Sequence, residues 1–192
     1  MMRDEVAERV AQVMRDVRRA DFLPELLQQS ADVDSPLPIG GGQTSSQPRT
    51  VAAMLRLLEP RAGHRVLDVG AGSGWTTALL ARLVGPEGWV VGVELDPGLA
   101  EWGADNLAAY AMSWAELHPA EPGVLGRPDL SPFDRILVSA EAHELPGELL
   151  DQLGFDAVMV VPVSGRMCRV ARARDGTVTL TRHGRYRFVP LR

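Results

Sequence analysis

The hydrophobic and polar positions of the chain follow two periods, one typical of helices and one typical of strands. Residues 4–19 place Val6, Val10 and Val13 at helical spacing between charged side chains, which predicts an amphipathic helix. From residue 48 onward, short apolar runs of strand length alternate with helix-like stretches. We predict helices at 48–58, 75–84, 98–110 and 146–153, and strands at 65–69, 89–94, 113–117, 133–139, 157–163, 167–173 and 177–182.

This order of elements predicts an α/β fold. Strands that alternate with helices form a mostly parallel sheet with helices on both faces, and the three closely spaced late runs predict an antiparallel edge. A length of 192 residues suits a single domain, so we expect residues 1–192 to form one. Residues 21–48 are rich in proline, glycine and small polar residues, which predicts a long ordered loop. Residues 1–48 are therefore expected to be an N-terminal helix followed by a capping loop.

A glycine-rich loop follows the predicted strand at 65–69. Residues 66–74 read Val-Leu-Asp-Val-Gly-Ala-Gly-Ser-Gly and lead into the predicted helix at 75–84. Gly70, Gly72 and Gly74 are spaced as G-x-G-x-G, whereas dinucleotide-binding folds usually have G-x-G-x-x-G. The spacing therefore favours a nucleoside-type ligand that has no pyrophosphate. A tight turn that needs glycine only for its positive φ is the alternative interpretation.

An acidic residue, Glu94, ends the next predicted strand. Ligands of open α/β sheets bind beyond the carboxyl ends of the strands, so this carboxylate is placed to accept hydrogen bonds from both hydroxyls of a ribose. Dinucleotide enzymes and methyltransferases share this arrangement, so Glu94 supports a nucleoside without choosing between the two classes. The alternative is a solvated acid at a strand end.

Several segments outside the glycine loop match one enzyme family in order and spacing. They are Leu37-Pro38-Ile39-Gly40, Gly42-Gln43-Thr44-Ser45-Ser46-Gln47-Pro48, Ala53-Met54-Leu55, Ser131-Pro132-Phe133-Asp134-Arg135-Ile136-Leu137-Val138 and Phe188-Val189-Pro190-Leu191. Together with the glycine loop, they resemble the protein-L-isoaspartate O-methyltransferases from about Phe22 to the C-terminus. The most specific part is the segment from Thr44 to Pro48. The resemblance implies a Rossmann-like class I S-adenosylmethionine-dependent methyltransferase fold.

The activity that this resemblance implies is the esterification of a damaged protein. The methyl group of S-adenosyl-L-methionine passes to the free α-carboxylate of an L-isoaspartyl residue and leaves S-adenosyl-L-homocysteine. The ester then closes to a succinimide, and its hydrolysis returns part of the chain to normal aspartyl. The implied partner is an isoaspartyl-containing protein or peptide. Its carboxylate is already ionised at neutral pH, so no strong general base is needed.

The resemblance also assigns roles to single residues. Ser46 corresponds to the active-site serine, whose hydroxyl would hydrogen-bond the acceptor carboxylate. A serine just ahead of a helix is also an ordinary N-cap, and the two roles are compatible. The residues implied for cofactor binding are Thr44, Asp68, Gly70, Ala71, Gly72, Ser73, Gly74, Glu94, Leu95 and Glu121.

Departures from the family pattern keep alternatives open. The usual Thr-Ile-Ser is Thr44-Ser45-Ser46 here, so a polar residue replaces an apolar packing residue. Where members carry Gly-Asp-Gly, whose Asp meets the adenine amino group, this chain has Glu121-Pro122-Gly123, and Glu121 is the possible substitute. One alternative is a peptide-modifying aspartate O-methyltransferase that gives aspartimide or isoaspartate in a precursor peptide. Another is a relative that binds cofactor or protein without turnover.

A nicotinamide-dependent reductase is a further alternative, but it would need G-x-G-x-x-G and offers no reason for the segment 44–48.

Composition narrows the remaining classes. A net charge of −5 argues against general nucleic-acid binding. The single cysteine, Cys168, excludes an internal disulfide and is expected to be a buried thiol in a reducing compartment. The four histidines show no metal-ligand spacing, so no metal is expected. Since no run approaches the ~18 apolar residues of a membrane span and the start lacks a signal-peptide core, we expect a cytoplasmic protein that does not bind membranes.

Overall fold

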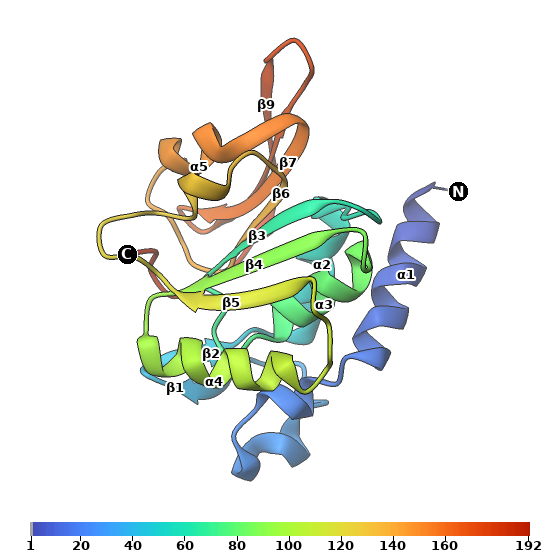
Figure 1. Ribbon diagram of the computed structural model, residues 1–192, viewed down its shortest axis with the longest axis vertical. Coiled ribbons are helices and arrows are strands. Elements are labelled where there is room, and N and C mark those ends of the chain that lie inside the picture. The colour runs from blue at the N-terminus through green and yellow to red at the C-terminus, as the bar shows by residue number, and fades with distance from the viewer. Residues whose placement is uncertain (1) are drawn as a thin grey trace.

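The computed structural model describes residues 2–192 and contains a seven-stranded mixed sheet (Figure 1). Its strand order is β5-β4-β3-β6-β7-β8-β9; β3 to β7 pair in parallel, and β8 and β9 add an antiparallel edge. The strands are β3 (Arg65–Val69), β4 (Trp89–Glu94), β5 (Ala115–Pro119), β6 (Phe133–Val138), β7 (Leu153–Val163), β8 (Arg166–Arg172) and β9 (Val178–Arg185). The helices are α1 (Met2–Asp16), α2 (Pro48–Leu58), α3 (Trp75–Val84), α4 (Pro97–Ala108) and α5 (Gly147–Gln152). The predicted α/β architecture and its antiparallel edge are confirmed.

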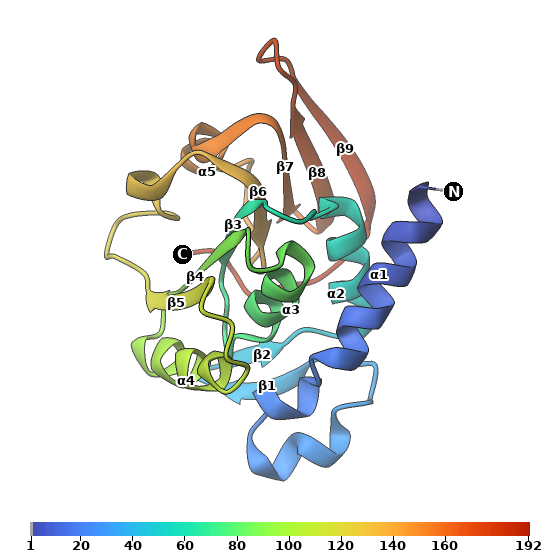
Figure 2. The same ribbon diagram turned by 45° about the vertical axis from the view of Figure 1, so that its right-hand side comes forward.

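The central strands are mostly apolar on both faces because both faces of the sheet are covered. Val66 and Leu67 are neighbours in β3 and point to opposite faces, yet both are fully buried. Val66 packs in a core with α1, α2, α3 and α4, whereas Leu67 packs in a second core with α5. Figure 2 shows α1, α2 and α3 on one side of the sheet and α5 on the other. Cys168 is buried in the second core, as expected.

Some element boundaries differ from those predicted. The first helix ends at Asp16 rather than at residue 19, and β7 begins at Leu153, directly after α5, rather than at 157. Leu153 pairs with Phe133 of β6, and the register then shifts before Arg135 pairs with Val158. The start of β7 is therefore set by its partner strand and a bulge, which the strand's own alternation does not reveal.

The prediction of an irregular loop over residues 21–48 is wrong in part. The segment contains two 3₁₀ helices, η1 (Arg19–Phe22) and η2 (Glu25–Ser30), and an antiparallel hairpin of β1 (Leu37–Gly40) and β2 (Gln43–Ser45). Arg19, a buried arginine just before this segment, stabilises it through its guanidinium group. It donates hydrogen bonds to the carbonyl oxygens of Ala31, Val33, Ser35 and Ser45 and to the hydroxyl of Ser45.

Candidate active site

A cavity of about 470 Å³ lies beyond the carboxyl ends of β3, β4 and β6. This is the edge at which open α/β sheets bind their ligands, and the volume lies within the usual range for small-molecule sites. Its walls are the glycine loop, the β1–β2 hairpin, the segment after β5 and the end of the chain, which Figure 1 shows beside the tip of β5. The predicted site residues that line it are Thr44, Ser46, Gly70, Ala71, Gly72, Ser73, Glu94, Leu95 and Glu121.

The glycine loop needs glycine at all three positions. Gly70, Gly72 and Gly74 have φ of 77°, 55° and 90°, in the left-handed region that other residues rarely adopt. A Cβ on Gly72 would also lie 3.0 Å from Cδ1 of Ile39 in the hairpin. Gly74 does not line the cavity; it is the N-cap residue of α3 and lies against Gly103 of α4. The loop therefore joins the hairpin, α3 and α4 closely around the cavity.

Glu94 joins the end of β4 to the glycine loop. Its Oε2 accepts a hydrogen bond from the backbone N–H of Gly72 at 2.8 Å, and its Oε1 accepts one from the N–H of Asp96 at 3.1 Å. Glu94 is only 6% exposed, yet it lines the cavity. Each carboxylate oxygen has about two lone-pair sites, so both oxygens keep capacity for a ligand hydroxyl. Asp96 then begins α4 by accepting the N–H of Leu99 at 3.0 Å.

Asp68 occupies a different place from the one expected. It is fully buried beneath the loop and does not line the cavity. Its Oδ2 accepts hydrogen bonds from the hydroxyls of Thr76 (2.7 Å) and Thr77 (2.8 Å), while its Oδ1 has no hydrogen-bond partner among the described residues. Burial raises the pKa of this carboxyl to about 6, and the two threonine hydroxyls partly oppose that rise. Asp68 therefore supports the first turn of α3 rather than the cavity wall.

The hairpin side of the cavity carries Thr44 and Ser46. The N-cap interpretation of Ser46 is wrong, because the N-cap residue of α2 is Gln47 and Pro48 follows it at the first helical position. Asp34 takes over the capping role: its Oδ1 accepts the N–H of Arg49 at 3.0 Å, and this hydrogen bond is the main cause that lowers the pKa of Asp34. The hydroxyl of Ser46 has no hydrogen-bond partner among the described residues, which leaves it available to a ligand.

The segment after β5 forms the opposite wall. The backbone carbonyl of Glu121 accepts the N–H of Val124 at 3.1 Å, and Gly123 has φ of 76°. Proline at the second position and a positive-φ glycine at the third are the residues that a type II turn requires, so the missing N–H of Pro122 costs the turn nothing. Glu121 is exposed and lines the cavity.

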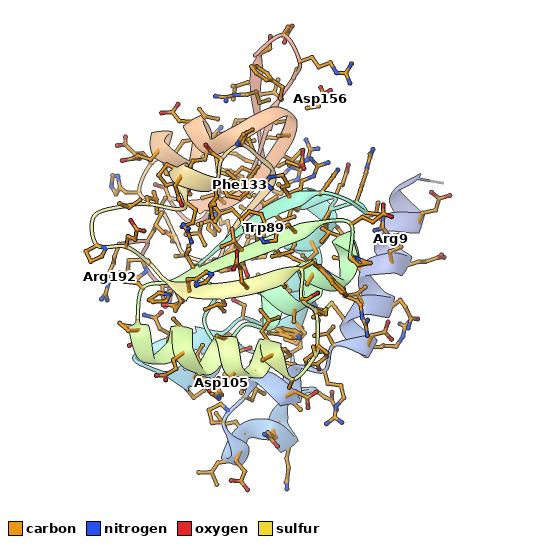
Figure 3. All side chains as sticks on the ribbon, viewed as in Figure 1. Arg9, Trp89, Asp105, Phe133, Asp156 and Arg192 are labelled. Carbon is orange, nitrogen blue, oxygen red and sulfur yellow. The ribbon has the colours of Figure 1, made fainter. Side chains whose placement is uncertain are left out.

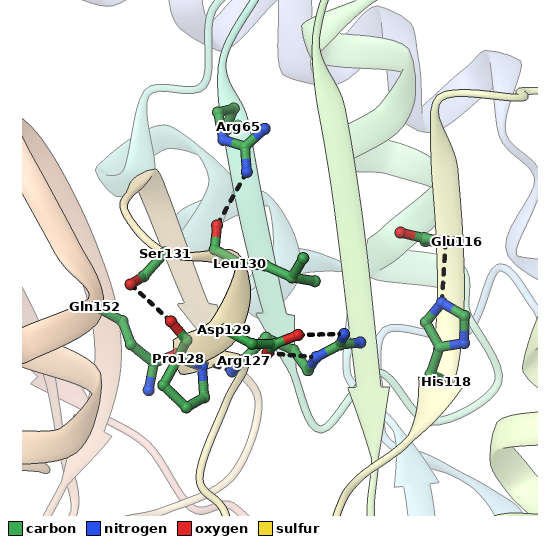
Figure 4. Close-up of polar contacts among 9 residues, drawn as sticks. All are labelled: Arg65, Glu116, His118, Arg127, Pro128, Asp129, Leu130, Ser131 and Gln152. Atoms are coloured by element: carbon green, nitrogen blue, oxygen red, sulfur yellow. Dashed lines mark hydrogen bonds and ion pairs between the residues drawn. The ribbon is translucent and has the colours of Figure 1, made fainter.

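A buried glutamine supports this wall from behind. Gln152 of α5 accepts the N–H of Arg127 at 2.8 Å and donates to the carbonyl of Leu125 at 2.7 Å, and Leu125 lines the cavity. Figure 4 shows this glutamine beside Arg127, whose guanidinium binds Asp129 through two hydrogen bonds. Gln152 thus holds the segment at Leu125 and Arg127, on both sides of Gly126, which also lines the cavity.

The end of the chain and the residues directly after β6 line the cavity, although no sequence motif predicted a role there for either. The wall includes Ser139, Ala140 and Val189 to Arg192. Glu141 holds the tail in place: its N–H donates to the carbonyl of Val189 at 2.7 Å, and its carbonyl accepts the N–H of Leu191 at 2.8 Å. The position of residue 139 at a strand end was the available signal. Nothing local could have shown that residues 189–192 return to this edge.

Among residues 2–192, no group of three or more histidine, cysteine, aspartate or glutamate side chains is placed to hold a metal ion. In the same part of the chain, no helix is both long and apolar enough to cross a lipid bilayer.

Comparison with known proteins identifies relatives over almost the whole chain. Residues 2–192 match the family model for Protein-L-isoaspartate(D-aspartate) O-methyltransferase (PCMT). Protein-L-isoaspartate O-methyltransferase of Methanopyrus kandleri is 46% identical over 189 residues, which are 96% of this chain and 84% of the relative. The Anaeromyxobacter dehalogenans protein of the same name is also 46% identical over 189 residues, covering 95% and 88% of the two chains.

Solved structures agree with these relatives. A protein-L-isoaspartate O-methyltransferase from Plasmodium falciparum, in complex with S-adenosyl-L-homocysteine, superposes with a TM-score of 0.83 and 25% identity over 96% of this chain and 90% of that one. A second protein-L-isoaspartate O-methyltransferase superposes with a TM-score of 0.82 and 26% identity over 97% of this chain and 62% of that one. The expected class I methyltransferase fold is therefore confirmed.

Proposed function

The chain belongs to the protein-L-isoaspartate(D-aspartate) O-methyltransferase family and is an S-adenosylmethionine-dependent enzyme of that activity, and on this premise we propose which cavity residues bind the cofactor and which bind the acceptor. The glycine loop, Glu94 and the wall at Leu95 and Glu121 hold the cofactor. Thr44, on the hairpin, lies on the cofactor side, and Ser46, directly after the hairpin, faces the acceptor. The observation that carries this division is that one cavity joins both sets of residues.

The cofactor side fits a nucleoside joined to an amino acid. Glu94 presents a carboxylate with free acceptor capacity at the end of β4, which suits the two hydroxyls of a ribose. Next to Glu94, the glycines of the loop present backbone without side chains to the cavity, where a side chain would obstruct the methionine part of the cofactor. Glu121 lies on the opposite wall and is proposed to meet the adenine amino group. Asp68 is proposed to act indirectly, by holding the start of α3 and the loop in place.

The acceptor side needs positioning more than acid–base chemistry. S-Adenosyl-L-methionine supplies a methyl group on a sulfonium, and transfer forms a carbon–oxygen bond while the carbon–sulfur electron pair stays on sulfur. The isoaspartyl carboxylate is ionised at neutral pH, so no residue has to remove a proton. Ser46 is proposed to donate its hydroxyl hydrogen bond to this carboxylate, which orients one oxygen toward the methyl group. The apolar part of the wall around Val69 and Ala140 keeps water away.

The N-terminal segment completes the site. We propose that residues 1–48 form, with the rest of the chain, one methyltransferase domain in which they act as the cap over cofactor and substrate. The hairpin within this cap contributes Ile39 and Gln43 to Ser46 to the cavity lining. A cytoplasmic location stays a prediction.

The test is methyl transfer from labelled S-adenosyl-L-methionine to an isoaspartyl peptide and to its aspartyl twin of the same sequence. The expected result is label in the isoaspartyl peptide alone, as a base-labile ester. Label in the aspartyl peptide alone would instead identify a peptide-modifying enzyme. Binding of S-adenosyl-L-homocysteine without label in either peptide would contradict the proposed substrate.

A further inference from the structure

The charge of the chain is divided unevenly. Residues 166–192 carry eight arginines and one acidic residue, Asp175, whereas the whole chain has 20 basic and 25 acidic residues. The preceding residues therefore hold twice as many acidic as basic side chains. The excess of arginine coincides with β8, β9 and the tail, which are the edge of the sheet and one wall of the cavity.

Most of these arginines show no side-chain hydrogen-bond or ion-pair partner among the described residues. Three are engaged: Arg169 and Arg172 donate to backbone carbonyls, and Arg174 forms an ion pair with Asp156. Five others show no side-chain hydrogen bond or ion pair with the rest of the described chain. These are Arg166, Arg182, Arg185, Arg187 and Arg192, all exposed.

Three of them form a patch on one face of the sheet edge. Arg166 is the partner of Arg185 in the antiparallel β8–β9 pair, and Arg182 is opposite Cys168, two residues along β8 from Arg166; a register shift after Arg166 leaves Gly184 of β9 without a partner between them. Paired residues of antiparallel strands share a face, and side chains two apart along a strand do too. Like charges directly opposite one another destabilise a sheet. The protein thus keeps an unfavourable arrangement, which an anionic partner would relieve.

The patch lies at the cavity end of the sheet edge. The turn between β7 and β8 is bonded to the residues that follow the cavity wall: Gly165 donates to Oε1 of Glu141, and Ser164 donates to the carbonyl of Ala142. From Arg185, the chain needs four residues to reach Val189 in the wall. Extended chain rises ~3.3 Å per residue, so the patch lies within ~13 Å of the cavity along this path.

We propose that Arg166, Arg182 and Arg185, the arginine patch, bind acidic side chains of the substrate polypeptide about three to five residues from its isoaspartyl position. The proposal rests on the proposed function and adds a preference for acidic substrates to it. A polypeptide is favoured over a nucleic acid because the patch adjoins the wall of a site that takes a peptide, and the chain as a whole is acidic and repels polyanions. The patch selects substrates through its charge; it does not take part in methyl transfer.

The experiment compares isoaspartyl peptides that are identical except for paired flanking residues, Glu-Glu, Gln-Gln or Lys-Lys, at three and four residues on either side. For the unaltered enzyme, we expect kcat/KM to be about three- to tenfold higher for the acidic peptide than for the neutral peptide when the flanking pair lies on one of the two sides of the isoaspartyl residue. The increase should come from a lower KM, and the basic peptide should give a lower kcat/KM than the neutral one. Raising the salt from 0.05 to 0.5 M should remove most of the difference because the groups are exposed.

Matched variants test whether the arginine patch causes the preference for the acidic peptide. In R166Q/R185Q the acidic and neutral peptides are expected to give equal kcat/KM, with the value for the neutral peptide unchanged. R174Q is the control, because Arg174 lies in the turn at the outer end of β8 and β9 and is paired with Asp156, which Figure 3 shows far from Arg192. Equal methylation of acidic and neutral peptides by the unaltered enzyme would overturn the proposal, as would a preference retained in R166Q/R185Q. Tighter binding of a single-stranded oligonucleotide than of the acidic peptide, lost in R166Q/R185Q, would assign the patch to nucleic acid instead.

These outcomes are separate from failure of the proposed function. If the neutral isoaspartyl peptide is not methylated at all, the proposed function itself fails. If it is methylated and charge has no effect, only the arginine patch proposal fails.

Discussion

Arg19 and Ser45 are joined by two hydrogen bonds although 26 positions separate them in the chain. The Nε of Arg19 donates to the hydroxyl of Ser45 at 3.1 Å, and its Nη2 donates to the carbonyl of Ser45 at 3.0 Å. Both residues are buried, and the guanidinium also lies 5.6 Å from the ring centroid of Trp75, a cavity residue. This pairing gives a physical reason for a serine where the family usually has isoleucine, since the hydroxyl accepts a donor that an aliphatic side chain would leave unpaired.

Replacing Arg19 by lysine should loosen the hairpin that carries Ser46. Lysine has three donors and no planar fork, so several of the carbonyls now held would lose their partner in a buried place. We expect Arg19→Lys to lower the free energy of unfolding by about 2–4 kcal/mol and to raise KM for an isoaspartyl peptide more than Kd for S-adenosyl-L-homocysteine. Urea unfolding and the two constants measure this, with Ser45→Ala as a milder variant at about 1–2 kcal/mol. An unchanged urea midpoint in Arg19→Lys would refute the role.

Ser46→Ala tests the acceptor side of the cavity. Loss of one hydrogen bond to a charged carboxylate is worth about 1.5–3 kcal/mol, so kcat/KM should fall about 10- to 100-fold. The affinity for S-adenosyl-L-homocysteine should stay within about twofold, because the cofactor side is untouched. Ser113→Ala, at an exposed position outside the cavity, is the control and should behave like the parent enzyme. Unchanged kcat/KM in Ser46→Ala would remove the serine from the proposed acceptor site.

Glu94→Ala tests the ribose contact. The change removes the carboxylate that both faces the cavity and holds the N–H of Gly72. Two lost charge-assisted hydrogen bonds should weaken S-adenosyl-L-homocysteine binding by about 1–3 kcal/mol, or roughly 5- to 150-fold in Kd. Calorimetric titration provides the measurement, and Glu101→Ala on the exposed side of α4 controls for charge. The same Kd in both variants would contradict the assignment.

Gly103→Ala tests how closely α4 must approach the glycine loop. A Cβ at this position would lie 2.7 Å from the carbonyl oxygen of Gly72 and 3.2 Å from the carbonyl carbon of Ser73. Alanine favours a helix interior by about 1 kcal/mol over glycine, but overpacking against backbone costs about 1–3 kcal/mol and shifts the loop. We expect lower stability and at least severalfold weaker S-adenosyl-L-homocysteine binding. Gly147→Ala has open space around its Cβ and is the matched control.

What the sequence predicted well was decided by local chemistry. The strand, glycine loop and helix at 65–84 follow from neighbouring residues, because an apolar run, positive-φ glycines and helix formers each act over a few positions. Glu94 could be assigned to the cavity because a strand end alone places it there.

What the sequence did not predict depends on contacts between distant segments. Arg19 organises the segment up to Ser45, Asp34 caps α2 in place of Ser46, and Glu141 holds the tail at Val189. None of these partners lies within the few residues over which periodicity carries information. The resemblance implied a cofactor-binding role for Asp68, but its side chain lies beneath the loop, where it accepts hydrogen bonds from two threonines of α3, and it does not line the cavity.

Asp68 also predicts a dependence of stability on pH. Burial raises the pKa of its carboxyl from 3.8 to about 6 in the folded protein, so folding favours the protonated form. The unfolded chain therefore binds fewer protons than the folded one between these values, and stability falls as pH rises through about 6. Asp68→Asn does not titrate, so the difference in unfolding free energy between the two proteins should change by up to about 3 kcal/mol from pH 4 to pH 7.

Urea unfolding of both proteins at a series of pH values measures this difference. A constant cost of asparagine cancels, because only the change of the difference with pH reports the titration of Asp68, and all other groups are common to both proteins. Thr77→Val provides a second variant: it removes one of the two hydroxyls that lower the pKa, so the titration should move to higher pH. A difference between parent and Asp68→Asn that is flat from pH 4 to pH 7 would show that this carboxyl does not titrate there, and that its desolvation is compensated within the fold.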